Sequence, residues 1–202
     1  MKSIIKDTII ITVITLVAGF LLGAVYTITK DPIARQEENA KQAACREVFV
    51  NADSFESIGE VDEALQTYLV DECGYTAQTI DEVFEAKDAA GEVIGYVINV
   101  TSGEGYGGDI SFAMGVQGDG TLNGISFLSI AETPGLGMKA DTEEFKAQFV
   151  GKQTDVIVYT KTGASADNEI DAISGASVTT GAVTNGVNAG LAAVKYLEGG
   201  NS

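Results

Sequence analysis

The sequence contains no histidine and no tryptophan, and it has only two cysteines among 202 residues. Without an imidazole, the chain cannot build a Ser-His-Asp or Cys-His nucleophile system, nor can it hold haem through histidine. Two thiols are too few for the usual Cys/His zinc site or for an iron–sulfur cluster held by four cysteines of one chain. No paired-carboxylate motif offers acid–base chemistry instead. If this chain takes part in redox chemistry, the redox group must therefore be added to it.

Basic residues are also scarce. The chain has 12 Lys and Arg against 29 Asp and Glu, a net charge of −17. Residues 31–202 hold 9 of the basic and 28 of the acidic residues, which gives this part a net charge of −19. Such a domain repels phosphate groups, so we expect no nucleic-acid partner and no flat contact with an anionic lipid surface. The simplest explanation of the charge is a well-solvated surface.

A long uncharged run occupies residues 8–29, TIIITVITLVAGFLLGAVYTIT. As a helix that rises about 1.5 Å per residue, it spans a hydrocarbon core of ~30 Å. A cleaved secretion signal is the alternative, but its apolar core is usually shorter, and no small-x-small cleavage site is evident. We therefore predict that residues 1–30 form an uncleaved transmembrane anchor helix with a short stub before it. Basic residues flank both of its ends, so charge alone does not orient it.

The remaining residues, 31–202, are enough for one domain, and no linker or internal repeat divides them. We predict a stalk helix over residues 31–50, because Asp31 can cap its start and Pro32 is tolerated in a first turn. The rest predicts an α+β fold with a twisted, largely antiparallel sheet, flanked by helices on one side and at its ends. The expected strands are 82–87, 93–101, 110–116, 121–130 and 154–159, with turns at 88–92 and 117–120, and the expected helices are 60–65, 142–149 and 178–197.

The last of these helices contains Gly181, Gly186 and Gly190. Each glycine costs about 1 kcal/mol in a helix relative to alanine. Their spacing leaves part of one helix face bare, so we expect a sheet or a ligand ring to approach that face closely.

A turn rich in hydroxyls precedes this helix: residues 171–177 read DAISGAS, and residues 178–181 read VTTG. Unpaired backbone N–H groups at a helix start attract anions, and Ser or Thr side chains add donors, so this turn is a place for a phosphate. The alternative is an ordinary Ser/Thr helix cap, which is far more common than a ligand site.

Two further motifs bear on this choice: residues 105–109, GYGGD, and residues 132–137, ETPGLG. Alone, the first suits a flexible entry to a strand, and the second suits an ordinary Pro-Gly loop with a buried Leu136. Together and in this order, the three motifs resemble the covalent-FMN subunit family. That family comprises the G subunit of the Rnf ion-translocating ferredoxin:NAD oxidoreductase and the related C subunit of the sodium-pumping NADH:quinone reductase. The resemblance runs from the first helix to the last and is clearest between residues 95 and 195.

The resemblance implies how FMN is held. In that family, the last hydroxyl of the pattern Asp-x-x-Ser/Thr-Gly-Ala-Ser/Thr receives the FMN phosphate as an ester, and here that hydroxyl is Ser177. Members more often have Thr at this position, but the ester needs only a hydroxyl. Thr179 and Thr180 are the rival hydroxyls, which the family pattern makes neighbours of the phosphate. The resemblance further implies these roles: Ser174, Gly175 and Ala176 around the phosphate, Thr133 and Leu136 against the isoalloxazine, Tyr106 and Gly107 lining the pocket, and Asp171 recognised by the flavin transferase, with a helix cap as its alternative role.

The resemblance also implies a function. The chain would be a membrane-anchored electron carrier in an Rnf-type complex, which couples ferredoxin oxidation and NAD reduction to Na⁺ or H⁺ movement. No substrate chemistry would occur on this chain. Its partners would be other redox subunits and a flavin transferase, with the N terminus in the cytoplasm and the domain outside the cell membrane. The alternatives are the C subunit of the quinone reductase, which is usually longer, a flavin-free anchored adaptor, and a stand-alone extracytoplasmic flavoprotein.

The two cysteines are Cys45 and Cys73. Outside the cytoplasm they could form one disulfide, but in an anaerobic host they could equally stay reduced. Cys45 lies in an apolar helical context, where a buried free thiol behaves as a small hydrophobe. We expect a catalytic role for neither residue.

Overall fold

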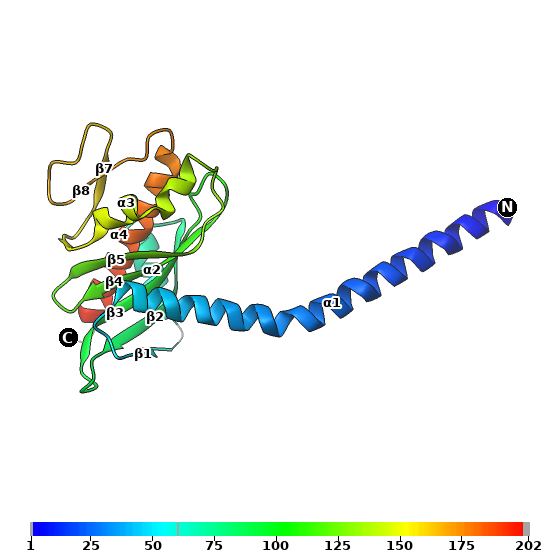
Figure 1. The fold of residues 1–202 in the computed structure, drawn as a ribbon, viewed down its shortest axis with the longest axis horizontal. Helices are drawn as coiled ribbons and strands as arrows, with labels where there is room; N and C mark the ends of the chain where they lie inside the picture. Colours follow the sequence, from blue (N-terminus) through cyan, green and yellow to red (C-terminus); the bar gives the residue numbers. More distant parts are fainter. Residues whose placement is uncertain (1, 60, 200–202) are drawn as a thin grey trace. The chain divides into compact units, whose positions relative to one another are not determined.

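The computed structural model describes residues 2–59 and 61–199 (Figure 1). By its internal contacts the chain divides into two compact units, residues 1–40 and residues 41–202. We predicted that the transmembrane anchor ends at residue 30. The division into two units does not test where a membrane segment ends, so this boundary stays a prediction.

The first unit belongs to one long helix, α1 (Lys2–Val48). Two separate helices were expected, with a new start at Asp31, and this expectation is wrong because Pro32 lies inside α1. Proline removes one backbone hydrogen bond, to the carbonyl of residue 28, so a long helix can continue past it with a local distortion. The apolar segment itself is confirmed. Its most apolar 18-residue window has a mean hydropathy of 2.5 and no residue buried within the chain, so its length and composition suit a membrane span.

The threonine hydroxyls of this apolar segment form hydrogen bonds within the helix. Each donates a hydrogen bond to the backbone carbonyl four residues earlier, at 2.8 or 2.9 Å. Such bonds remove the cost of placing a hydroxyl in an apolar environment that offers no other partner. These residues are Thr8, Thr12, Thr15, Thr27 and Thr29.

The second unit is built on an antiparallel sheet in which neighbouring strands follow the order of the chain (Figure 1). The predicted α+β class with an antiparallel sheet is therefore confirmed. The sheet strands are β1 (Ser54–Ser57), β2 (Gln78–Lys87), β3 (Val93–Ser102), β4 (Ile110–Gln117), β5 (Thr121–Ser129) and β6 (Lys152–Gln153). The other elements are α2 (Glu63–Asp71), the 3-10 turns η1 (Gly137–Asp141) and η2 (Ala147–Phe149), α3 (Glu143–Lys146), the parallel pair β7 (Val158–Thr160) and β8 (Glu169–Asp171), and α4 (Ser177–Gly199).

The expected strand at 154–159 is wrong. Residues 152–153 pair with the edge of the large sheet as β6, whereas β7 belongs to a separate parallel pair with β8. The Thr154 hydroxyl donates to the carbonyl of Val156 and accepts the N–H of Val156, at 3.1 and 3.4 Å. A side-chain turn of this kind competes with strand pairing and ends β6. The short helix expected at 60–65 also lies later, because Asp62 caps α2 by accepting the N–H of Ala64.

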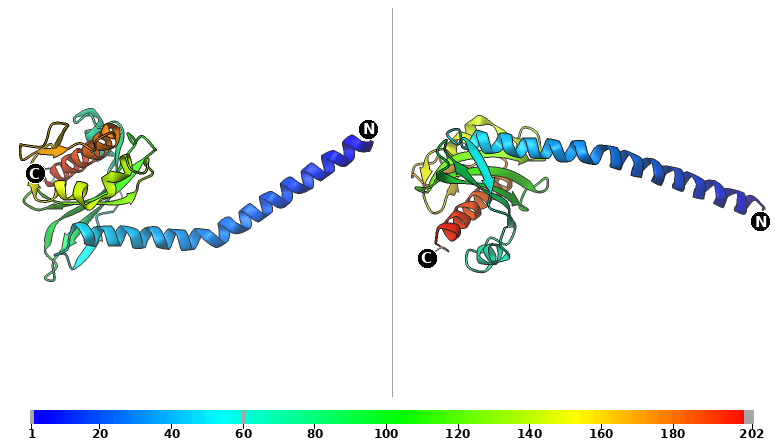
Figure 2. Two further views of the ribbon diagram at one scale, coloured as in Figure 1. Left: turned by 45° about the horizontal axis from the view of Figure 1, so that its top comes forward. Right: turned by 90° about the horizontal axis from the view of Figure 1, so that it is seen from below.

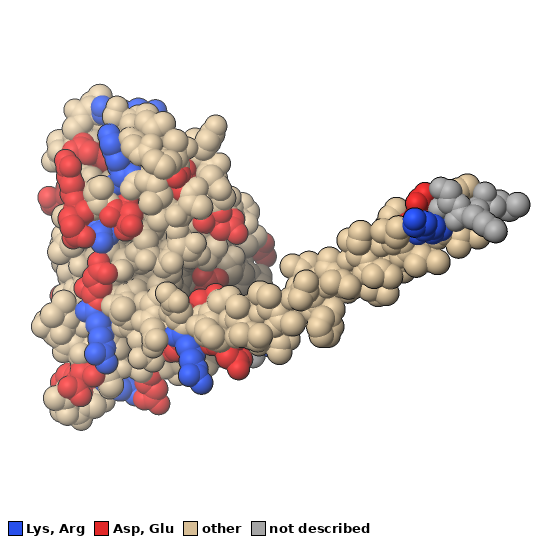
Figure 3. Space-filling view, turned by 45° about the vertical axis from the view of Figure 1, so that its right-hand side comes forward, with Lys and Arg blue, Asp and Glu red and all other residues tan. Residues whose placement is uncertain are grey.

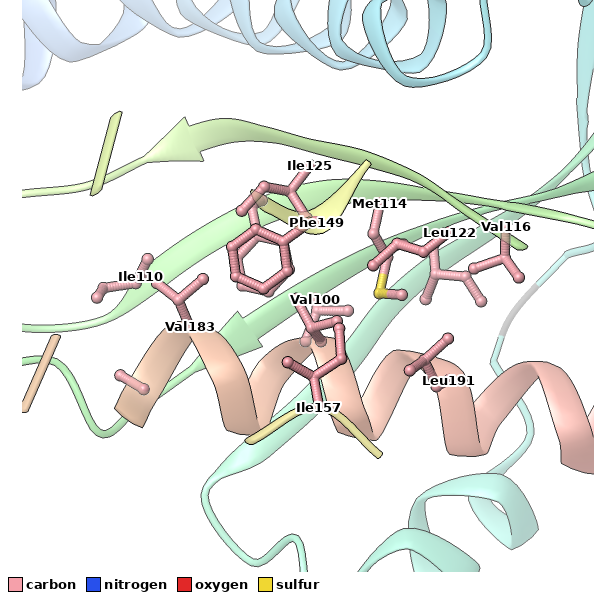
Figure 4. Close-up of a cluster of buried hydrophobic side chains, with 14 of the residues drawn as sticks. Val100, Ile110, Met114, Val116, Leu122, Ile125, Phe149, Ile157, Val183 and Leu191 are labelled. Carbon is pink, nitrogen blue, oxygen red and sulfur yellow. The ribbon is translucent and has the colours of Figure 1, made fainter. Parts of the chain in front are cut away.

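Helix α4 crosses one face of the sheet, and a hydrophobic core fills the space between them (Figures 2 and 4). A β-carbon added to Gly186 would lie 2.8 Å from the Phe112 ring, and one added to Gly190 would strike the Met114 sulfur. The predicted close approach of a sheet to the glycine face is therefore confirmed for these two positions. The labelled core residues in Figure 4 include Val100, Ile110, Met114, Val183 and Leu191.

The last turns of α1, which belong to the second unit, cover the other face of the sheet. Helices therefore lie on both faces, so the sheet is flanked by helices as expected, although we expected them on one side and at its ends. The second cluster of buried residues consists of Ala44, Cys45, Val48, Phe49, Ala86, Val97 and Ala113. Cys45 is buried there and Cys73 is half-buried, and neither forms a disulfide. Figure 3 shows the acidic side chains spread over the second unit, and a long stretch of α1 without charge.

Candidate functional site

The three sequence motifs meet at one end of α4. The first lies in the loop between β3 and β4, and the second lies between β5 and η1. The third forms the turn between β8 and α4. The sheet brings the first two loops together because β3, β4 and β5 are neighbours in it, and α4 begins beside them.

The turn before α4 touches the second motif directly. Gly175 has a φ of +80°, a backbone conformation that residues with a β-carbon rarely adopt. A β-carbon added there would lie 3.1 Å from Cδ2 of Leu136. Leu136 is itself 44% exposed, so the alternative of an ordinary loop with a buried leucine does not hold. Its loop is closed by the Thr133 carbonyl, which accepts the N–H groups of Leu136 and Met138.

The hydroxyls at the start of α4 differ in their surroundings. Thr180 is fully buried, and its Oγ1 accepts the N–H of Ile173 at 3.0 Å and donates to the carbonyl of Ala176 at 2.9 Å. Thr179 is 1% exposed and faces Gly137, where an added β-carbon would lie 2.6 Å from its Oγ1. Ser177, the first residue of α4, is only half-buried. Of the three hydroxyl-bearing residues among 177–180, all described, Ser177 alone is not buried.

The backbone at this point suits an anion. The first N–H groups of a helix have no partner within the helix, and the helix dipole adds a partial positive charge. The first backbone bond of α4 runs from the N–H of Thr180 to the carbonyl of Ala176 at 3.0 Å, so the N–H groups before it point toward the turn. Gly175 and Ala176 add little bulk there. A phosphate joined to Ser177 would therefore meet free backbone donors.

The first motif contributes an exposed aromatic ring. Tyr106 is 76% exposed, and Gly107 next to it is also exposed. A β-carbon added to Gly107 would strike the carbonyl oxygen of Ala131, so the first loop lies directly against the start of the second. The loop of Tyr106, the loop of Leu136 and the turn before Ser177 thus follow one another in contact, and Tyr106 and Leu136 are exposed on them.

Two family profiles match this chain. One, described as the RnfG N-terminal region, covers residues 1–48, and another, described as an FMN-binding domain, covers residues 105–192. The G subunit of the Na⁺-translocating ferredoxin:NAD⁺ oxidoreductase complex of Acetobacterium woodii is 32% identical, with 97% of this chain and 94% of that protein aligned. The G subunit of the proton-translocating ferredoxin:NAD⁺ oxidoreductase complex of Clostridium ljungdahlii is 33% identical, with 98% of this chain and 96% of that protein aligned. The chain belongs to the RnfG family.

Similarity to the quinone reductase is shorter. The C subunit of the Na⁺-translocating NADH-quinone reductase of Pasteurella multocida is 40% identical over 112 residues, which cover 52% of this chain and 43% of that protein. The crystal structure of Shewanella oneidensis NqrC superposes with a TM-score of 0.52 at 17% identity, over 75% of this chain and 84% of that one. The crystal structure of the C subunit from Parabacteroides distasonis superposes with a TM-score of 0.50 at 24% identity, over 73% of this chain and 77% of that one. The two families share this fold, and the full-length similarity favours RnfG.

Membership of the RnfG family, together with the apolar helix, makes this chain a membrane-anchored subunit of an oxidoreductase complex. It also identifies residues 105–192 as an FMN-binding domain. All three motifs and α4 up to residue 192 fall within that range.

Asp171 does not bind the start of α4. Its Oδ1 accepts the N–H of Ala164 at 2.6 Å, and its own N–H donates to Oε1 of Gln148 at 2.6 Å. It therefore fastens the loop between β7 and β8, and the alternative role as a cap of α4 is wrong. Its side chain is exposed and lines a cavity of about 330 Å³ together with Ser174, Lys139 and Phe145.

Sequence reasoning missed Glu132, the first residue of the second motif. This carboxylate is only 6% exposed, and its Oε1 accepts the N–H of Tyr106 at 2.8 Å. A glutamate beside a Pro-Gly turn is normally expected at the surface, so local sequence gives little sign of its burial. Its position becomes clear only once the loops of different strands are brought together.

Proposed function

We propose that this chain carries FMN, joined through its phosphate to the hydroxyl of Ser177, and passes electrons between other redox subunits of an Rnf-type complex. FMN supplies the electron-transfer chemistry when bound, and the protein supplies its position and surroundings. The complex would couple ferredoxin oxidation and NAD⁺ reduction to the movement of Na⁺ or H⁺, in keeping with the names of the related proteins.

The observation that carries this proposal is the contrast between three neighbouring hydroxyls. Ser177 is accessible at the first residue of α4, whereas Thr179 and Thr180 are buried. Thr180 is further engaged in two hydrogen bonds that hold the turn. An enzyme that attaches FMN needs a hydroxyl it can reach, and this requirement favours Ser177 over its two rivals.

The other residues of the site have roles in this proposal that follow from their positions. The free N–H groups at the start of α4 hold the phosphate oxygens, and Gly175 leaves room for them. Leu136 and Tyr106, both exposed, cover the isoalloxazine and exclude water from part of it. Thr133, exposed in the same loop as Leu136, can donate a hydrogen bond to the ring edge.

The remaining parts of the proposal concern maturation and location. A flavin transferase would recognise Asp171, whose carboxylate is exposed near the turn. The N terminus would lie in the cytoplasm and the acidic domain on the outer side of the membrane. An acidic surface there would keep the domain away from anionic lipid headgroups.

The experiment is to co-express the full-length chain with a flavin transferase and to record in-gel flavin fluorescence and intact mass under denaturing conditions. Wild type, Ser177→Ala and Ser174→Ala are compared. Ser174 is an exposed serine of the same turn, so its variant is the matched control. We expect a fluorescent band with the added mass of an FMN phosphoryl group in wild type and Ser174→Ala, and a dark band of unmodified mass in Ser177→Ala.

Two results would contradict the proposal. Covalent FMN in Ser177→Ala would move the attachment to another hydroxyl, such as Thr179 or Thr180. An unmodified, dark wild-type chain, with the transferase active on a control protein, would favour an anchored adaptor without flavin.

A further inference from the structure

Glu132 is the residue at which all three motifs of the site come together. It is 6% exposed, although carboxylates are rarely buried unless they have partners. Its two oxygens face different motifs. Oε1 accepts the N–H of Tyr106 at 2.8 Å, and a β-carbon added to Gly105 would lie 3.1 Å from the same oxygen. The first motif therefore wraps closely around Oε1.

The other oxygen faces the second motif and α4. A β-carbon added to Gly137 would lie 2.7 Å from Oε2 of Glu132 and 2.6 Å from Oγ1 of Thr179. The carboxylate and the Thr179 hydroxyl thus both line the small space above Gly137. Thr179 is the third residue of α4, so the carboxylate also lies beside the positive end of the helix dipole. This position compensates part of the cost of burying a charge.

The loops joined by Glu132 are those that carry the exposed residues of the site. Tyr106 belongs to the first loop, and Leu136 belongs to the second. Leu136 in turn contacts the turn that leads to Ser177 through Gly175. A shift of the Glu132 side chain would therefore change the position of both exposed residues relative to α4, while leaving the sheet untouched.

We propose that Glu132 is a positioning residue for the flavin: its carboxylate holds the Tyr106 and Leu136 loops against the start of α4 and so restricts the motion of the isoalloxazine. This inference rests on the proposed function, because it takes FMN to be attached at Ser177. Glu132 binds the backbone N–H of Tyr106 and itself belongs to the loop of Leu136, so it acts on the ring through these two residues.

The test uses the full-length chain, co-expressed with a flavin transferase and purified in detergent. Time-resolved fluorescence anisotropy of the attached FMN measures the amplitude of fast local ring motion. Intact mass measures attachment separately, so failure of the proposed function appears as missing mass in the wild type. Thermal unfolding followed by circular dichroism checks that each variant is folded.

Glu132→Ala removes the acceptor for the Tyr106 N–H, and a lost hydrogen bond of ordinary net strength shifts a local equilibrium about fivefold. We expect a flavinylated, folded variant in which the share of mobile flavin rises by about this factor. Glu132→Gln keeps an oxygen in place of Oε1 and is expected to restore most of the wild-type anisotropy. A purely structural role would lower the melting temperature without changing the anisotropy.

Two further variants complete the test. Glu132→Asp keeps the carboxylate but shortens the side chain by one methylene, so it should also raise the share of mobile flavin. This variant replaces Glu132→Ala in the test if the alanine variant does not fold. Glu169→Ala is the matched control, because Glu169 also accepts backbone N–H groups, from Ser165 and Ala166, but is the first residue of β8. Wild-type anisotropy in folded, flavinylated Glu132→Ala or Glu132→Asp would overturn the proposal, as would equal loosening in Glu169→Ala.

Discussion

Leu136 packs against Gly175 so closely that a β-carbon on the glycine would lie 3.1 Å from Cδ2 of the leucine. The two residues are far apart in the sequence, in different motifs, and neither belongs to a regular helix or strand. Their contact joins the loop that could cover a flavin ring to the turn that could hold its phosphate. Position 175 therefore has two requirements, a left-handed backbone and the absence of a side chain.

The variant Gly175→Ala tests both requirements. A left-handed conformation costs a residue with a β-carbon about 1–2 kcal/mol, and the contact with Leu136 adds to this cost. Gly163→Ala is the matched control, because Gly163 has a φ of +98° and nothing within 4 Å of an added β-carbon. Chemical denaturation should show a larger loss of unfolding free energy in Gly175→Ala than in Gly163→Ala. Equal losses would mean that the contact with Leu136 contributes nothing.

Glu47 predicts a dependence of stability on pH. Burial raises the pKa of its carboxyl, but hydrogen bonds from Ser126 and Lys146 outweigh this effect, and the pKa is lowered from about 4.5. A group whose pKa is lower in the folded state contributes stability above its unfolded pKa and loses it as the pH falls through the folded pKa. The melting temperature should therefore decrease when the pH is lowered below about 4.5, because the bonds that join the end of α1 to β5 and α3 are lost.

Circular dichroism melts of Glu47→Gln check this prediction. The variant should be less stable than wild type near neutral pH and should lose less on acidification, because its side chain does not titrate. Glu144→Gln is the control: Glu144 is exposed and takes part in none of the ion pairs found among residues 2–59 and 61–199. Parallel pH curves for wild type and Glu47→Gln would rule out this role for Glu47.

The part of the fold that sequence predicts well is the part fixed by local pattern. Strands β3, β4 and β5 match the expected ranges to within a residue, because their apolar and β-branched residues leave few alternatives. The strand expected at 154–159 failed because one hydroxyl, that of Thr154, formed a turn with the backbone of Val156. Local propensity does not register such a bond.

The site shows a different limit. The phosphate position at the start of α4 follows from local sequence, since the turn and the helix are neighbours along the chain. The convergence of the three motifs does not follow from local sequence. It was expected only through resemblance to a family. Glu132 illustrates why: its burial depends on Tyr106 and Thr179, which lie on two other segments, as well as on Gly137 at the end of its own motif. No local rule marks a glutamate for such a place.

Thr180 should be a structural residue of the turn. Its hydroxyl accepts the N–H of Ile173 and donates to the carbonyl of Ala176, both across the turn that precedes Ser177. Thr180→Val keeps the shape of the side chain and leaves a buried N–H without a partner, which costs about 1–3 kcal/mol. We expect a lower melting temperature, with covalent FMN still attached at Ser177. Loss of the FMN mass from a well-folded Thr180→Val would instead place Thr180 in the attachment chemistry.

The glycines of α4 should respond differently to the same substitution. A β-carbon at Gly186 would lie 2.8 Å from the Phe112 ring, whereas one at Gly181 would lie 3.7 Å from the Tyr159 ring, an ordinary contact. Gly186→Ala overpacks the core between α4 and the sheet and should cost about 1–3 kcal/mol. Gly181→Ala should gain up to about 1 kcal/mol, because alanine favours a helix and nothing opposes it. Equilibrium denaturation of both variants measures the difference. If both substitutions stabilised the protein, the core would have room at Gly186, and the glycine face of α4 would not be needed for its approach to β4.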